Sequence, residues 1–114
     1  MSQDCIFCKI SRGDIPTAFL HQDSQCIAIR DIHPKAPTHL LVIPQRHVTT
    51  LTGVAREDEP LVGHLLAVAG AVARQEGITE GGYRLVVNQG PDAGQEVVHL
   101  HVHVLGGRRL GAMG

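Results

Sequence analysis

The sequence predicts an α+β domain whose sheet is mainly antiparallel. A chain of 114 residues has the length of one domain and can bury a core without help from metals or disulfides. A single segment has the 3.6-residue periodicity of a long helix, and five short segments have the composition of strands. Hydrophobic residues make up 43% of the chain and charged residues 18%, which is typical of a globular protein. We expect residues 1–114 to form one domain.

The first half of the chain is predicted to hold a short helical turn and three strands. The helical turn is expected over 5–13, and the strands over 18–21, 25–32 and 39–43. Between the last two strands, the segment 31–37 contains two prolines, which disfavour both a helix and a central strand. Pro44 is expected to stop the third strand.

Residues 58–76 are predicted to form the long helix. Asp58 is a suitable N-cap, Pro60 is tolerated in the first turn, and Gly77 is a stop signal. Two apolar stripes lie side by side at helical spacing. They consist of Leu61, Leu65, Val68 and Val72, and of Val62, Leu66, Ala69 and Ala73. The wide apolar arc indicates either a deeply seated helix or a helix whose second stripe contacts a partner subunit.

The last segments are two strands around a glycine-rich loop. The strands are expected over 82–88 and 97–105, the loop over 89–95, and the final strand ends at two glycines. Three histidines alternate with apolar residues in this strand, so His99, His101 and His103 are expected to share one face. The residues between them would anchor the opposite face in the core.

Three imidazoles on one sheet face favour chemistry over packing. The first and third would start about 13 Å apart along a strand, so two could share a metal ion but all three could not. Histidine also suits phosphoryl or nucleotidyl transfer, because it is nucleophilic when neutral and binds phosphate when protonated. The loop before the strand could offer backbone N–H groups to the same phosphate.

Composition excludes several other classes of function. Ten Lys and Arg against eleven Asp and Glu leave a net charge of -1, so no nucleic acid partner is expected. No apolar run approaches the roughly 20 residues of a membrane span, and the polar residues 1–9 lead us to expect no secretory leader. Three cysteines are a poor disulfide framework. We therefore expect a cytoplasmic protein with reduced thiols and no membrane association.

The chain resembles the histidine triad (HIT) family, and within it the branch of histidine-triad nucleotide-binding proteins (the Hint branch). The resemblance rests on the alternating histidines of 99–103, the Gly106-Gly107-Arg108 that follows, and short matches along nearly the whole chain. Those matches are at 5–10, 15–16, 31–32, 36–39, 42–44, 47, 63–65, 83–84 and 86–88. It implies a HIT-like fold, a homodimer, a purine nucleotide substrate and no organic cofactor. The implied reaction is hydrolysis of purine nucleoside 5′-phosphoramidates, such as adenosine 5′-monophosphoramidate, through a nucleotidyl-histidine intermediate.

The resemblance also implies a role for each candidate catalytic residue. His101 matches the nucleophile, and His103 matches the histidine that hydrogen-bonds the phosphate. His99 and His39 match supporting histidines that set the orientation and tautomer of the nucleophile.

Six further positions match the family's nucleotide-binding residues. Asp31 matches the carboxylate that holds the ribose hydroxyls, Ile32 an apolar wall for the purine, and Asn88 a contact on the phosphate side. The loop over the α-phosphate corresponds to Gly94, Gln95 and Glu96. Glu96 departs from the family pattern, because well-known members carry a serine there. A serine can donate a proton to the leaving group, whereas an ionised carboxylate can only accept.

A zinc site is implied by the zinc-containing branches of the family. Cys5 and Cys8 form a C-x2-C pair, and the two further ligands match His47 and His99. Four protein ligands would close the shell, so the zinc would be structural. The alternative is a pair of reduced, unliganded thiols. Cys26 has no partner motif and is expected to be a small core residue.

Three other functions fit parts of the same pattern. They are a dinucleoside polyphosphate hydrolase, a nucleotide-binding regulatory module with weak catalysis, and a metal-binding protein that uses the histidine face. The intact triad favours an enzyme, a nucleotide hydrolase of the adenosine 5′-monophosphoramidase type.

Overall fold

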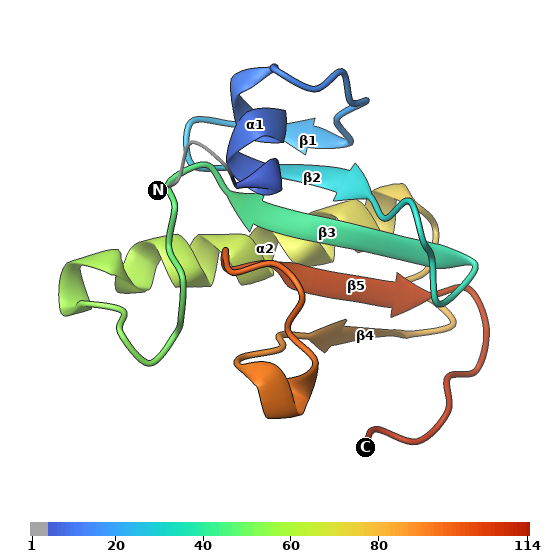
Figure 1. Cartoon of the computed structure of the whole chain (residues 1–114). Helices are drawn as coiled ribbons and strands as arrows, with labels where there is room; N and C mark the ends of the chain where they lie inside the picture. The colour runs from blue at the N-terminus through green and yellow to red at the C-terminus, as the bar shows by residue number, and fades with distance from the viewer. Residues whose placement is uncertain (1–4) are drawn as a thin grey trace.

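The molecule is built on a five-stranded antiparallel sheet with the strand order β1-β2-β3-β5-β4, which confirms the predicted α+β class. The computed structural model describes residues 5–114 (Figure 1). Its strands are β1 (His21–Gln22), β2 (Cys26–Arg30), β3 (Thr38–Pro44), β4 (Tyr83–Val86) and β5 (Val102–Gly106). Its helices are α1 (Ile6–Arg12) and α2 (Glu59–Gln75), with 3-10 turns η2 (Arg56–Asp58) and η3 (Pro91–Ala93).

The two faces of the sheet pack against different helices. In β2, Cys26 and Ala28 belong to the cluster that α2 covers, whereas Ile27 and Ile29 belong to the cluster that contains Phe7 of α1. Alternation continues in β3 and β5, as expected for a sheet that is buried on both sides. Figure 1 shows α2 behind β3 and β5, and α1 on the near side of the sheet over the ends of β1 and β2. The face with α1 is the one that carries the histidines.

Helix α2 confirms the predicted long helix, but only part of its second apolar stripe is buried. Ala69 and Ala73 are buried in the core beside the first stripe, while Leu66 is 48% exposed. Asp58 stands at the N-cap position but makes no capping hydrogen bond, because its carboxylate pairs with Arg46 at 2.7 Å. Gly77 has the positive φ of a helix stop, as predicted. Within residues 5–114, no helix is both long and apolar enough to cross a membrane.

Several predicted boundaries are wrong, and the last strand shows the largest error. The strand expected over 97–105 pairs only over Val102–Gly106, so His99 and His101 precede it. The first strand is two residues long and begins at His21, and the fourth ends at Val86 instead of Asn88. Pro44 is the last residue of β3 instead of the first residue after it. Strand ends depend on where partner strands stop, which composition does not encode.

Candidate functional site

Three histidines from the two central strands meet on the face of the sheet opposite α2. His39 comes from β3, His101 immediately precedes β5, and His103 is the second residue of β5. The rings of His101 and His103 have centroids 4.9 Å apart, and those of His103 and His39 lie 5.1 Å apart. Phe7 of α1 packs edge-on against His101 at 5.0 Å, which holds that ring from the other side.

The tautomer of His101 is fixed by the backbone. Its Nδ1 lies 2.7 Å from the carbonyl oxygen of His99. A carbonyl oxygen only accepts, so His101 donates its Nδ1–H and its Nε2 keeps a free lone pair. The ring is buried, and its hydrogen bond and the contact with Phe7 restrict its orientation. The arrangement therefore presents an oriented imidazole with an unprotonated Nε2.

A hydrogen-bond relay fixes the tautomers of the other two rings. The backbone N–H of Lys35 donates to Nδ1 of His39 at 2.9 Å, so the proton of His39 is on Nε2. That Nε2–H donates to Nδ1 of His103, also at 2.9 Å. His103 in its neutral form must then carry its own proton on Nε2. The relay thus leaves an N–H donor on His103, beside the lone pair of His101.

Two supporting roles differ in detail from the sequence-based expectation. His39 hydrogen-bonds His103 and not His101. His99 sets the tautomer of His101 through its backbone carbonyl, while its imidazole points to the two cysteines. Neither difference is visible in the sequence, because both depend on groups that only the fold brings close.

The pKa of His103 is lowered to about 4. Burial is the main cause, and the neighbouring imidazoles of His101 and His39 add to it. Burial also lowers the pKa of His39, against the attraction of Asp31. His103 is therefore neutral at physiological pH and acts as a neutral hydrogen-bond donor.

We expect stability to fall with acidification because of this shift. The unfolded chain binds a proton at His103 near pH 6.5, whereas the folded protein resists it down to about pH 4. The contribution is complete above pH 6.5 and is lost as the pH falls to 4. In urea unfolding across this pH window, the free energy of unfolding should fall less in His103→Gln, which cannot titrate at this position, than in the native protein. Parallel curves for the two proteins would contradict the assignment.

The predicted ribose and purine residues lie on the turn that precedes His39. Asp31 accepts the backbone N–H of His33 at 2.8 Å through Oδ1, and its Oδ2 lies 3.4 Å from Nε2 of His39. Ile32 is 86% exposed, so its side chain is open to a ligand. Phe7 and Ile10 of α1 are buried in the core. The carboxylate thus stands next to the histidine cluster, beside an exposed apolar side chain.

The remaining predicted nucleotide residues surround the glycine-rich loop. Asn88 follows β4 by two residues, and Val86, the last residue of that strand, pairs with His103. Gly94 has a positive φ, while Glu96 is exposed. The side chain of Gln95 is engaged within the loop, since it accepts the N–H of Gly90 at 2.8 Å and donates to the carbonyl of Val97. Gln95 therefore shapes the loop, and its amide is not free.

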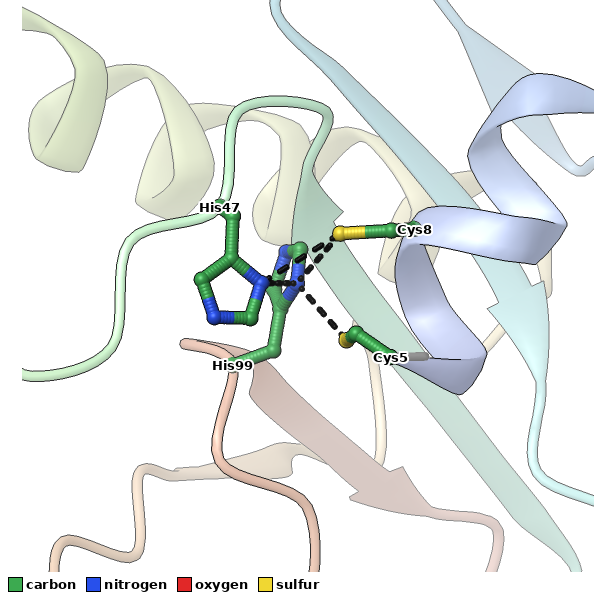
Figure 2. A group of neighbouring side chains, drawn as sticks. All are labelled: Cys5, Cys8, His47 and His99. Carbon is green, nitrogen blue, oxygen red and sulfur yellow. Dashed lines mark hydrogen bonds between the residues drawn. The ribbon is translucent and has the colours of Figure 1, made fainter. Parts of the chain in front are cut away.

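Cys5, Cys8, His47 and His99 converge from three distant parts of the chain (Figure 2). The Nδ1 of His99 lies 3.3 Å from the sulfur of Cys5, 3.6 Å from that of Cys8 and 3.1 Å from Nδ1 of His47. Zinc bonded tetrahedrally to sulfur and nitrogen separates such donors by about 3.3–3.8 Å. The spacing of the donor atoms therefore fits a zinc ion.

The surroundings of this cluster also suit a metal ion. His99 is fully buried, and its Nε2–H donates to the carbonyl of Pro44 at 2.8 Å, which leaves Nδ1 without a proton. Burial, together with the neighbouring Cys5, raises the pKa of Cys8. A cation bound among these two thiols and two imidazoles would favour the thiolate form of the cysteines.

Sequence reasoning missed the groups that orient the site. These are the ring of Phe7, the backbone N–H of Lys35, and the carbonyls of Pro44 and His99. A backbone group leaves no signal in residue identity, so only the resemblance of 5–10 to family members pointed toward Phe7.

Comparisons with a family model, with curated proteins and with solved structures all indicate the same family. Residues 12–110 match the family model described as HIT domain. The chain is 48% identical to the purine nucleoside phosphoramidase of Escherichia coli K12, over 99% of this chain and 95% of that protein. It superimposes on a HIT family hydrolase from Legionella pneumophila with a TM-score of 0.91 and 46% identity, covering 95% and 96% of the two chains. A zinc-bound histidine triad family protein from Mycobacterium smegmatis gives a TM-score of 0.80 at 34% identity, covering 95% and 78%.

Proposed function

Because the chain belongs to the HIT domain family, we propose that this nucleotide hydrolase splits purine nucleoside 5′-phosphoramidates into the nucleoside monophosphate and the free amine. The observation that carries the proposal is the 2.7 Å bond from Nδ1 of His101 to the His99 carbonyl, which frees Nε2 for attack. The 48% identity to a purine nucleoside phosphoramidase supports the same substrate class.

The reaction proceeds in two displacements at phosphorus. The Nε2 lone pair of His101 forms a bond to the α-phosphorus, the P–N bond to the amine breaks, and the amine takes a proton from solvent as it leaves. Water then attacks the α-phosphorus of the nucleotidyl-histidine and loses a proton to solvent, and the bond from phosphorus to Nε2 breaks to release His101 and the nucleoside monophosphate. The His99 carbonyl keeps its hydrogen bond to Nδ1–H throughout and stabilises the positive charge on the modified ring.

His103 and His39 support the phosphate during both displacements. The relay gives His103 an Nε2–H donor, which stabilises the phosphoryl oxygens as negative charge develops. His39 holds that donor in place and is itself held by the N–H of Lys35. His39 is thus a positioning residue for His103, while His99 positions His101.

The nucleotide is held at both ends of the cluster. Asp31 accepts the two ribose hydroxyls, and Ile32 covers the purine. Asn88, Gly94 and Glu96 face the phosphate side, over the loop that Gln95 closes. Glu96 as a carboxylate accepts a hydrogen bond from the leaving amine, whereas a serine in its place could donate one.

The metal centre has a structural role in this proposal. Cys5, Cys8, His47 and His99 would hold one zinc ion in a closed shell and tie α1 to the segments before β5 and after β3. Bound zinc would cross-link these segments, and its closed ligand shell would leave no position open for water or substrate. His99 would be both a ligand and the residue whose carbonyl orients His101.

We also propose that the protein forms a homodimer and is located in the cytoplasm. Leu66 of α2 and Tyr83 and Leu85 of the edge strand β4 are exposed apolar side chains, and Tyr83 lies beside α2 at Gly70. Apolar surface beside an open strand edge favours a homodimer. Free cysteines and a thiolate metal site suit a reducing compartment.

A substrate panel tests the proposed activity. Turnover of adenosine 5′-phosphoromorpholidate or the unsubstituted phosphoramidate should exceed turnover of diadenosine polyphosphates. The reverse preference would make the protein a dinucleoside polyphosphate hydrolase. Binding of AMP without any single-turnover adenylylation would identify a nucleotide-binding module instead.

Asp31→Asn should weaken nucleotide binding by roughly 1–3 kcal/mol, the scale of a hydrogen bond to a charged group. The substitution keeps the side-chain shape and removes the charge and one acceptor. The loss should nearly vanish for 2′,3′-dideoxynucleotides, which lack the hydroxyls. Calorimetric titration of both ligands measures it, with Asp14→Asn as the control, because Asp14 is exposed and pairs with Arg12. Equal losses for both ligands would give Asp31 a structural role.

A further inference from the structure

A second cluster of metal-ligating side chains lies on the opposite face of the sheet from the catalytic histidines. His21 of β1, Asp23 of the following turn, Cys26 of β2 and His64 of α2 each offer one ligand atom, and these atoms all lie within 4.8 Å of one another. Cys26 belongs to the core cluster that α2 covers, and His21 pairs with Ala28 of the same cluster. The proposed function makes no use of this group.

The two imidazoles converge on one oxygen atom. Nε2 of His21 and Nε2 of His64 are both 2.7 Å from Oδ2 of Asp23. The other oxygen, Oδ1, accepts the backbone N–H groups of Gln25 and Cys26 at 2.7 and 2.8 Å. The backbone therefore fixes the carboxylate and directs Oδ2 at the imidazoles from two separate elements.

The cluster has a solvent side and a buried side. The side chains of His21, Asp23 and His64 are 31, 28 and 33% exposed, so an ion can reach them from solvent. The sulfur of Cys26 lies 3.8 Å from Oδ2 of Asp23, and the residue is fully buried. A cation entering from the surface would meet two nitrogens and an oxygen first and the sulfur beneath them.

The donor set selects a class of metal. Two imidazoles, one carboxylate and one thiol match the borderline divalent cations, above all Zn²⁺, whereas Ca²⁺ and Mg²⁺ prefer oxygen ligands. We propose that His21, Asp23 and His64, with Cys26 beneath them, form a second Zn²⁺ site that joins the β1–β2 hairpin to α2.

Binding requires protons to move before the ligand atoms are free. Each neutral imidazole exchanges its Nε2 proton with solvent for one on Nδ1 and coordinates through Nε2, while the thiol of Cys26 releases its proton to solvent. The nitrogen-to-oxygen distances must lengthen, because ligands around tetrahedral zinc stand about 3.3 Å apart. Both imidazoles are partly exposed and can retreat by a few tenths of an ångström.

Zinc stoichiometry tests the site directly. Equilibrium dialysis against buffered free Zn²⁺, followed by metal analysis, should give two equivalents per chain in the native protein. His64→Gln and Asp23→Asn should each weaken one equivalent by more than about 100-fold and leave the other in place. Asparagine still accepts the backbone N–H groups of the turn, so Asp23→Asn separates ligation from folding. His33→Gln, a change at an exposed histidine, should keep both equivalents.

Cobalt identifies the fourth ligand. Co²⁺ added to protein that already holds one zinc should show a thiolate-to-cobalt charge-transfer band, and Cys26→Ala should lose that band. Cys5→Ser/Cys8→Ser should lose the other equivalent and keep this one, which separates this site from the proposed structural centre. A native protein that saturates at one equivalent would overturn the proposal. So would a second equivalent that survives both His64→Gln and Asp23→Asn.

Discussion

Replacing His101 with alanine is expected to abolish turnover of a purine nucleoside phosphoramidate. The substitution removes the only atom placed to bond to phosphorus in the proposed mechanism, the Nε2 lone pair that the His99 carbonyl exposes. Loss of a covalent nucleophile lowers kcat by a factor on the order of 10⁴ or more. Binding of AMP should persist, because Asp31 and the loop over the phosphate are untouched.

Three measurements make this result decisive. Steady-state assays with His33→Ala as the control show whether loss of an exposed histidine elsewhere matters. Rapid-quench mass spectrometry of the native enzyme should find the nucleotidyl group on the peptide that contains His101, and on no peptide of the variant. A folded His101→Ala variant with native activity would disprove the mechanism, regardless of which substrate the protein prefers.

The second large effect is expected from Cys5→Ser/Cys8→Ser. Both sulfurs lie within 3.6 Å of an imidazole nitrogen of the metal cluster, so the double substitution removes two of four ligands. We expect the variant to lose about one zinc per chain and to melt roughly 10 °C or more below the native protein, the scale of losing a few kcal/mol in a domain of this size. Its kcat, measured well below its melting temperature, should change far less.

A chelator supplies the matched control for this experiment. Native protein and the double variant, both stripped of metal, should melt at similar temperatures, because a cation that binds only the folded state stabilises it by linkage and the variant has already lost the ion at this site. Native protein that is purified without chelators and contains no metal would refute the site. A stripped enzyme that stays folded, is inactive and regains activity with zinc would make the metal catalytic and displace His101 from its role.

The family relationship explains why the candidate site was accessible from sequence. The alternating histidines of 99–103 identified the site, and the short matches elsewhere carried roles to Asp31 and His39. Cys5, Cys8, His47 and His99 were also proposed as one group from the sequence, although the chain separates them by up to 94 residues, and the structure brings them together. The boundary of the last strand was not accessible, because β5 begins only where β3 and β4 can pair with it.

The sequence by itself determined the local elements and the chemical inventory. Helical periodicity located α2, glycines and prolines located the turns, and the spacing of the histidines indicated imidazole chemistry. These features could be predicted because each depends on only a few neighbouring residues. Only the tertiary structure decided which proton each imidazole carries and which distant groups meet. The carbonyl of His99 sets the tautomer of His101, the N–H of Lys35 sets that of His39, and α2 brings His64 to Asp23 across 41 residues. Backbone donors and acceptors are the same at almost every residue, so their positions are specified by how the chain packs and not by which residues it contains.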